Sequence, residues 1–167
     1  DSDGCTGVEN FTVGQPAALS ASFAVVDNDC FNGSSGSITT TISGGTPNYN
    51  FVWDDGPLTQ NRTNLSEGTY TVTVTDNNGC VLVDSATVSE GSEILINMSV
   101  NSNNNCFGDS TGSVSANYSG GNPPYTFLWS ESSAGSGSNS TINNLAAGTY
   151  TITVTDNLGC TAEDSIT

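Results

Sequence analysis

Apolar and polar residues alternate along several short stretches of this chain. Positions 69–75 place Tyr, Val and Val between threonines, and positions 149–155 repeat the arrangement with Tyr, Ile and Val. Positions 49–53 and 125–129 each put Tyr, Phe and Trp on one face. A period of two residues is typical of a β-strand with one buried face. The pattern predicts strands near 18–26, 36–43, 48–54, 60–65, 69–76 and 81–88, and a second set near 94–100, 112–118, 124–130, 140–145, 149–156 and 160–167.

The second set of strands is a copy of the first. Residues 30–53 return 76 positions later as 106–129, with Cys, Gly, Pro, Tyr, Phe and Trp in the same order. Residues 65–80 return 80 positions later as 145–160, because the second copy carries extra Ser and Gly in its middle loop. Two copies of one module form an array, and arrays usually bind, space or scaffold.

No stretch shows a helical period with caps, so the predicted fold is all-β, with two tandem immunoglobulin-like antiparallel β-sandwich modules. Leu-x-x-Gly-x-Tyr at 65–70 and 145–150 matches the tyrosine corner of such sandwiches. The pattern lapses near 14–16 and 90–92, and these short joints predict semi-rigid stacking. The expected domains are 1–13, the tail of a preceding repeat, 14–89, the first module, and 90–167, the second module.

The charge is strongly negative, with 17 acidic residues against one basic residue, Arg62, and a formal net charge of -16. Such a chain repels phosphate backbones and anionic lipid, so no nucleic-acid partner is expected. No apolar run is long enough for a transmembrane helix, which argues against membrane insertion. The chain opens with Asp rather than Met and is expected to be a window cut from a longer secreted polypeptide.

Five cysteines occupy two kinds of repeat position. Cys30 and Cys106 precede a Gly-rich strand start, whereas Cys5, Cys80 and Cys160 each follow a Gly at a turn. Pairing within each module predicts the disulfides Cys30–Cys80 and Cys106–Cys160, with Cys5 bonded to a partner upstream of this chain. Each bond would close a loop of about 50 residues and stabilise its module by roughly 4 kcal/mol on the chain-entropy model.

A second pairing stays open, joining Cys5 to Cys30 and Cys80 to Cys106, and free buried thiols are the third alternative. In the usual immunoglobulin order, the turn before the second strand and the turn before the last strand lie at opposite poles. The bond Cys30–Cys80 therefore needs a variant topology or an extended crossing by residues 31–36. Either pattern of disulfides predicts an oxidising, extracytoplasmic compartment.

The repeated motifs resemble the SprB-type repeat of Bacteroidetes cell-surface and gliding adhesins. They comprise Cys-Phe at 30–31 and 106–107, Gly-Ser-Ile/Val at 36–38 and 112–114, Ser-Gly-Gly at 43–45 and 119–121, Leu-x-x-Gly-Thr-Tyr-Thr at 65–71 and 145–151, and Val-Thr-Asp-Asn-x-Gly-Cys at 74–80 and 154–160. The resemblance covers both modules nearly end to end. It implies a long, repetitive extracellular protein at the cell surface, exported by a type IX route and serving adhesion, gliding or filament formation.

The expected function is therefore that of non-catalytic structural or adhesive repeat modules of a surface adhesin or filament. Expected partners are neighbouring repeats of the same chain, with lateral or end-to-end self-association. One alternative is a carbohydrate-binding module pair that holds surface polysaccharide through loops near 54–62 and 130–140, where the two copies differ most. Another alternative is a pair of accessory domains of a secreted hydrolase.

Catalytic chemistry is poorly provided for, because the chain has no His and its cysteines are expected to be paired. We therefore expect no enzyme activity and no cofactor other than calcium, which takes several oxygen ligands. Candidate calcium ligands are Asp27, Asp29, Asp76, Asp109 and Asp156, and the bond Cys30–Cys80 would bring the first three together. The alternative is that these residues cap turns and solvate the surface.

Three Asp-Ser/Thr-apolar or Asp-Ser-Thr sequences, at 84–86, 109–111 and 164–166, resemble sites at which Bacteroidetes attach O-glycans to exported proteins. They predict a glycoprotein modified at Ser85, Ser110 and Ser165. The first and third sites fall at equivalent positions of the two repeats.

Overall fold

The computed structural model describes residues 9–131, 134–137 and 139–167, and every helix or strand assigned there is a β-strand. The first module comprises β1 (Ser20–Val26), β2 (Gly36–Ser43), β3 (Asn50–Trp53), β4 (Arg62–Leu65), β5 (Gly68–Thr75) and β6 (Val81–Val88). The second comprises β7 (Ile94–Ser102), β8 (Gly112–Gly120), β9 (Thr126–Trp129), β10 (Ala134–Ser136), β11 (Asn139–Leu145), β12 (Tyr150–Thr155) and β13 (Thr161–Ile166). The all-β prediction is confirmed. The described part holds no helix of the length and hydrophobicity that a membrane span requires.

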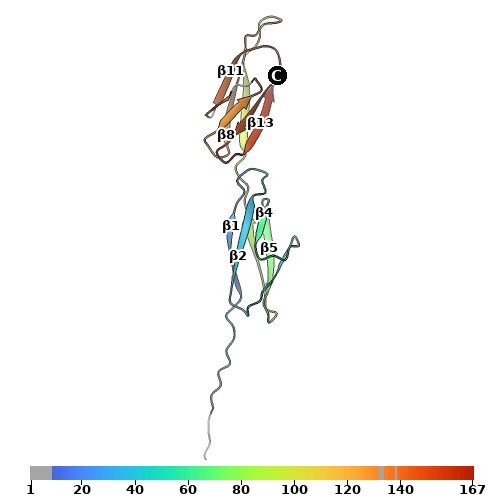
Figure 1. Cartoon of the computed structure of the whole chain (residues 1–167), viewed down its shortest axis with the longest axis vertical. Coiled ribbons are helices and arrows are strands. Elements are labelled where there is room, and N and C mark those ends of the chain that lie inside the picture. The colour runs from blue at the N-terminus through green and yellow to red at the C-terminus, as the bar shows by residue number, and fades with distance from the viewer. Residues whose placement is uncertain (1–8, 132–133, 138) are drawn as a thin grey trace, which may run out of the picture.

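Each module is a sandwich of two antiparallel sheets, and the two modules are stacked end to end along the long axis of the molecule (Figure 1). In module 1 the sheet β1-β2-β4 packs against β3-β5-β6, and in module 2 the sheet β7-β8-β11 packs against β10-β9-β12-β13. This pairing is the strand order A-B-E over C-F-G of an immunoglobulin sandwich. The immunoglobulin-like prediction is therefore confirmed.

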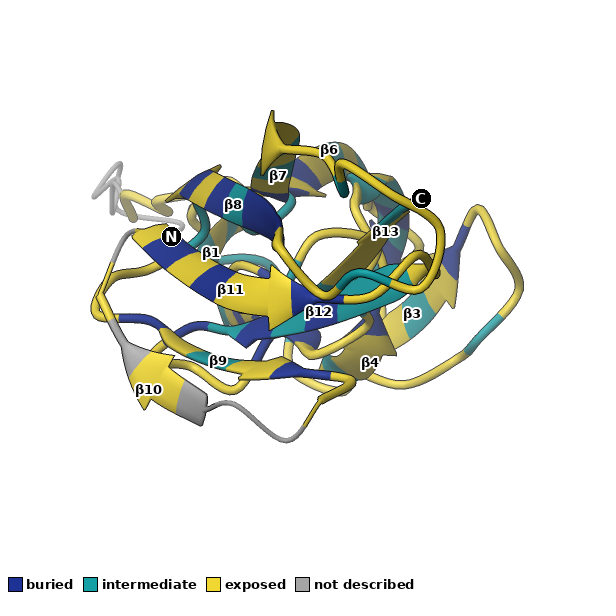
Figure 2. Ribbon diagram, turned by 90° about the horizontal axis from the view of Figure 1, so that it is seen from above, coloured by how far each residue is buried: buried dark blue, intermediate teal, exposed yellow. Residues whose placement is uncertain are grey.

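Each sandwich has its own core, built by the alternation seen in the sequence. Val72 and Val74 on β5 are fully buried, while the threonines between and beside them face outward or lie half-buried. Trp53 and Trp129 are each 1% exposed at the centre of their modules. Buried and exposed positions alternate visibly along β8 and β11 (Figure 2). The two cores are separate clusters, so each module packs as a unit.

Both predicted tyrosine corners are present. The Tyr70 hydroxyl donates to the carbonyl of Ser66 at 3.0 Å, and the Tyr150 hydroxyl donates to the carbonyl of Ala146 at 2.8 Å. Each bond fixes the loop that leads into the central strand of its sheet, β5 or β12.

Strand β10 was not predicted from the sequence. It lies in the Ser- and Gly-rich insertion of the second copy and pairs antiparallel with β9. A Cβ on Gly135 would lie 2.8 Å from Cζ of Phe127, so a side chain there would displace this ring. Because the strand is short and its residues are small, no apolar alternation marks it in the sequence.

The two poles of each module have different contents. At what we call the exit pole, the loop after the first strand lies beside the start of the second strand and the end of the last one. In module 1 this pairing places Val26 against Ser37 and Val88 against Gly68. At the entry pole, the turn before the last strand lies beside the end of the second strand. The exit pole of module 1 meets the entry pole of module 2 (Figure 1).

Candidate functional site at the joint between the modules

The segment 89–93, which leads from β6 to β7, is bound to module 1 before it enters module 2. The Ser89 amide donates to Oδ1 of Asp27 at 2.7 Å, and the Asn28 amide donates to the Ser89 carbonyl at 3.0 Å. The connection is therefore held against the loop that follows β1.

The same segment packs tightly on the backbone of that loop at Gly91. A Cβ on Gly91 would lie 2.4 Å from the carbonyl oxygen of Asp29 and 2.8 Å from the carbonyl carbon of Cys30. Contacts this short exclude any side chain unless the joint opens. The glycine is required here by close approach of two backbones rather than by an unusual φ angle.

A disulfide closes the joint covalently. Cys30, in the loop after β1, is bonded to Cys160, in the turn between β12 and β13, with a Cα–Cα distance of 5.4 Å. Cys160 is only 6% exposed, and Cys30 packs against the core of module 2. Phe31 and Ile94 line the cleft around the bond. The disulfide therefore lies in a cleft that residues of both modules line.

Both disulfide patterns expected from the sequence are wrong. Cys30 bonds neither Cys80 nor Cys5, and the predicted bond Cys106–Cys160 is absent because Cys160 has Cys30 as its partner. Cys80 and Cys106 are exposed free thiols. Cys5, with residues 1–8 of the predicted tail 1–13, lies outside the described residues.

The physical reason for this correction is the strand order. Cys30 lies at the exit pole of module 1, and Cys80 lies in the β5–β6 turn at the entry pole, so the length of β5 separates them. The modules keep the usual immunoglobulin topology, and no variant crossing brings the two cysteines together. The neighbouring module, by contrast, presents a turn cysteine directly at the exit pole.

Asp156 shapes the turn that presents Cys160. Its Oδ1 accepts hydrogen bonds from the amides of Leu158 and Cys160, both at 2.9 Å, and its Oδ2 accepts from the Asn122 amide at 2.8 Å. The carboxylate is buried and ties the turn to the β8–β9 loop. Its three hydrogen bonds hold the turn in which Cys160 lies bonded to Cys30 of module 1.

Asp76 makes the same three bonds in module 1, with the amides of Thr46 at 2.8 Å, Asn78 at 2.9 Å and Cys80 at 2.8 Å. These bonds, with the one from Thr46 the strongest, lower the pKa of Asp76 against the opposing effect of desolvation. The turn is thus built identically in both repeats, whether or not its cysteine is bonded.

The five candidate calcium ligands do not gather into one site. Asp27 and Asp29 lie at the exit pole of module 1, whereas Asp76 lies at the entry pole, so the expectation that these three meet is wrong. Asp109 accepts from the Cys106 amide at 2.9 Å, and Asp156 holds its own turn. Within residues 9–131, 134–137 and 139–167, no three His, Cys, Asp or Glu side chains are close enough to share a metal ion.

The three predicted glycosylation sites are exposed. Ser85 lies on β6, Ser165 lies at the equivalent place on β13, and Ser110 lies in the loop before β8. The Ser85 and Ser165 amides each donate to Oδ1 of the preceding Asp at 2.8 Å. The modification of these three residues stays a prediction.

The loop near 54–62 is fastened to the core of module 1. Arg62 donates to both carboxylate oxygens of Asp55, at 2.7 and 2.6 Å, and this pairing lowers the pKa of Asp55. The guanidinium lies 5.3 Å from the Trp53 ring and 5.4 Å from the Tyr70 ring, a cation–π arrangement. In the other expected recognition loop, near 130–140, residues 132, 133 and 138 lie outside the described residues.

One residue of the joint, Asn28, was missed in the sequence. It is buried, and its Oδ1 accepts from the Gly36 amide at 2.9 Å, which fixes the loop that carries Cys30. Asn104 makes the equivalent bond to the Gly112 amide at 3.0 Å. The available signal was an asparagine two positions before the cysteine in both copies.

The SprB repeat family model matches the chain at two places, residues 22–58 and 99–134. This chain carries two SprB repeats. Each match begins within the first strand of a module and extends past the third, so it includes the loop cysteine, Cys30 or Cys106. SprB repeats occur in cell-surface proteins. No curated protein matches the chain.

Two solved structures are similar to the SprB repeat pair. One is the C-terminal 282-residue fragment of intimin in complex with the intimin-binding domain of the translocated intimin receptor, with 17% identity, a TM-score of 0.38, and coverage of 90% of this chain and 64% of that fragment. The other is the amphioxus IgVJ-C2 molecule, with 17% identity, a TM-score of 0.33, and coverage of 81% and 96%. This chain spans less than two thirds of the intimin fragment. Nothing about function follows from similarities of this size.

Proposed function

We propose that this chain is a non-catalytic spacer that transmits tension in an extracellular surface adhesin or filament. The SprB repeats support a structural repeat module, and the chain offers no histidine for acid–base or nucleophilic catalysis. Export by a type IX route and a role in adhesion or gliding belong to this proposal and rest on the SprB resemblance.

The observation that carries the proposal is the Cys30–Cys160 bond. A pull on the two ends of the chain enters at residues 1–29, crosses the disulfide and leaves through residues 161–167. Residues 31–159, which include all but the outermost strands of the two sandwiches, lie inside the closed loop and are not stretched. The covalent bond thus keeps tension off strands β2 to β12, which supply most of both cores.

The charge of the chain supports an extended stalk. With a formal net charge of -16 and one basic residue, the modules repel one another, and like charges disfavour collapse of one module onto another. At 0.15 M salt this repulsion acts over about 8 Å, so it influences neighbouring modules and not distant ones. The joint itself supplies the stiffness.

Single-molecule force spectroscopy of the full chain, held at its two ends, tests the proposal. We expect the oxidised chain to lengthen by no more than residues 1–29 and 161–167 allow, roughly 120 Å of contour. The reduced chain should show two module unfolding events, because residues 31–159 then add about 440 Å of contour. The matched control is Cys80→Ser, which removes a free thiol and should leave the oxidised trace unchanged.

Two results would count against a spacer. Full unfolding of both modules in the oxidised chain would mean that the joint does not carry the tension. Saturable binding of the oxidised chain to a polysaccharide on a glycan array, lost when residues 54–62 are replaced, would instead favour carbohydrate recognition.

A further inference from the structure

The exit pole of module 2 repeats the half-joint that module 1 uses. Asn104, Cys106 and Phe107 stand 76 positions after Asn28, Cys30 and Phe31. Phe31 is 41% exposed beside module 2, whereas Phe107 is fully exposed at 109%. The cysteine of the first set is bonded, and the cysteine of the second is an exposed thiol. The second set has the same three residue types, but in the part of the chain that the structure describes no module packs on it.

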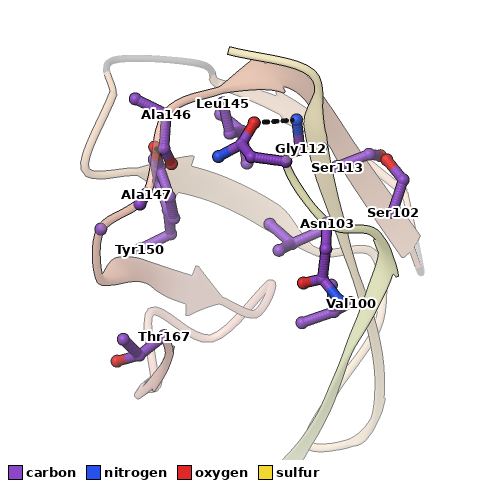
Figure 3. A pocket seen from close by; sticks show the side chains of 13 residues that line it. Val100, Ser102, Asn103, Gly112, Ser113, Leu145, Ala146, Ala147, Tyr150 and Thr167 are labelled. Carbon is purple, nitrogen blue, oxygen red and sulfur yellow. Dashed lines mark hydrogen bonds between the residues drawn. The ribbon is translucent and has the colours of Figure 1, made fainter. Parts of the chain in front are cut away.

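A pocket opens at this same pole (Figure 3). It is lined by residues that include Val100, Asn104, Gly112, Leu145, Tyr150 and Thr167. The dashed bond in Figure 3 runs from the Gly112 amide to Asn104, so the asparagine that fixes the cysteine loop also forms the pocket wall.

In module 1 the corresponding space is filled by Val88. This side chain is 1% exposed and belongs to the core that contains Leu65. It lies so close to Gly36 that a Cβ there would be 2.5 Å from its Cγ1. Gly36 and Leu65 correspond to Gly112 and Leu145 of the open pocket. The pocket therefore has the shape of a seat for an apolar residue at the end of the last strand.

The entry pole of module 1 is the complementary half-joint. Cys80 is exposed on a turn that the Asp76 carboxylate holds by hydrogen bonds. Asp156 holds the turn of Cys160 by the same bonds. The exit pole of module 2 thus carries the loop cysteine Cys106 and the pocket, and the entry pole of module 1 carries the turn cysteine Cys80. The two ends are the two sides of the joint already seen between modules 1 and 2.

We propose that both free ends are docking sites for further copies of this repeat, which deepens the spacer function proposed above. When a further copy of the repeat is joined after Thr167, its residue equivalent to Val88 enters the pocket. Cys106 bonds the turn cysteine of the following copy, and Cys80 bonds the loop cysteine of the preceding copy.

Each new staple is a two-electron oxidation. The two thiols lose two protons and two electrons and form one S–S bond, and a disulfide oxidant takes up both electrons and both protons to become two thiols. The extracytoplasmic compartment expected for this chain supplies such oxidants.

The proposed series of disulfides between modules has a mechanical consequence. At each disulfide the tension bypasses most of two modules, as it does at the bond from residue 30 to residue 160. Between successive staples on one path, tension crosses only the backbone from Cys80 to Cys106, which holds β6, the joint and β7. Alternate staples form a second path of the same kind. A repeat array joined in this way cannot be stretched open one module at a time.

The test is a three-module chain in which residues 1–167 are followed by a second copy of residues 88–167, all with Cys5→Ser. Cleavage before Asp and mass spectrometry without reduction identify each disulfide. We expect the peptide of Cys106 to be linked to the peptide of the added copy's turn cysteine, besides the bond Cys30–Cys160. Isotope labelling of the added segment by ligation distinguishes the two copies of the turn peptide.

Two control variants keep the result decisive. With Cys106→Ser, the added turn cysteine should become alkylated by iodoacetamide while Cys30–Cys160 persists. With Val88→Asp in the added segment, hydrogen exchange at residues 103–112 should rise to the level of the two-module chain. The proposal is overturned if Cys106 stays a free thiol in the three-module chain, or if it bonds Cys80. Neither outcome alters the force response of the two-module chain, which tests the spacer function separately.

Discussion

The turn at 76–80 and the turn at 156–160 are built alike and end in different chemical states. Each is held by an aspartate that accepts three backbone hydrogen bonds of 2.8 to 2.9 Å, and each ends in a cysteine. Cys80 is an exposed thiol, whereas Cys160 is buried and bonded to Cys30. The difference comes from the neighbour and not from the turn.

The comparison shows where the function of the repeat resides. Local sequence prepares a cysteine at a fixed place, and the adjacent module decides whether it is cross-linked. A single module therefore contains two half-joints, and the complete joint exists only between modules.

The largest effect should come from removing one cysteine of each turn in separate variants. Cys160→Ser opens a loop with a sequence separation of 130, which the chain-entropy model values at about 5 kcal/mol. Cys80→Ser removes an exposed thiol and should change stability by less than about 0.5 kcal/mol. Chemical denaturation monitored by tryptophan fluorescence gives both values, and equal effects of the two variants would remove the distinction between the turns.

A smaller effect should come from crowding the joint without touching the disulfide. Gly91→Ala places a Cβ 2.4 Å from the Asp29 carbonyl and should cost about 1–3 kcal/mol, as overpacking does. Gly14→Ala is the matched control, because no atom of the described residues lies within 4 Å of its Cβ. Calorimetry measures both, and small-angle scattering should show a changed angle between the modules only for Gly91→Ala. An unaltered profile and an unaltered melting temperature would show that the joint is loose.

Acid should weaken the turn of module 1. The pKa of Asp76 is lowered in the folded state, so its hydrogen bonds contribute stability above the unfolded value of about 3.8. That contribution is lost as pH falls through the lower folded pKa, and module 1 should melt earlier there. Asp76→Asn should reduce this pH dependence while lowering stability at pH 7. If the melting temperatures of the two proteins fall in parallel on acidification, Asp76 is not the group responsible.

The smallest effect concerns the two cores, which differ where Tyr118 of module 2 corresponds to Ile42 of module 1. Among the residues that the structure describes, the buried Tyr118 hydroxyl has no hydrogen-bond partner, and burial raises the pKa of Tyr118 to about 12. Tyr118→Phe should therefore be neutral or stabilising by up to about 1 kcal/mol at pH 7.

The dependence of stability on pH in the alkaline range sharpens this prediction. The wild-type chain should lose stability as pH rises from about 10 toward 12, because the unfolded tyrosine ionises first. Tyr118→Phe should lose less over that range. The control Tyr125→Phe breaks a bond to the Gly120 carbonyl and should cost about 1 kcal/mol at pH 7. A destabilised Tyr118→Phe would mean that the hydroxyl has a partner.

Much of each module could be predicted from the sequence, because its determinants are local. Two-residue alternation located the long strands, and the aromatic strips placed Trp53 and Trp129 in the cores. The Leu-x-x-Gly-x-Tyr motif predicted both tyrosine corners. In each case a few adjacent residues determine the structure.

The joint could not be predicted in the same way. Partner choice for Cys30 depends on which pole of the neighbouring module comes near it, and no pattern within one repeat contains that information. The assumption that each module carries its own disulfide also placed Asp76 beside Asp27, and the strand order separates them. Immunoglobulin strand order already places the turns of Cys30 and Cys80 at opposite poles of the module, which argues against a bond between them.

The most direct test of the central claim is a disulfide map of the native two-module chain. The single basic residue makes trypsin useless, but cleavage before Asp puts each of the five cysteines on its own peptide. Without reduction, we expect the peptide that begins at Asp29 to be linked to the one that begins at Asp156, while the peptides of Cys80 and Cys106 react with iodoacetamide. Links between Cys30 and Cys80 and between Cys106 and Cys160 would make each module self-contained and would contradict the account.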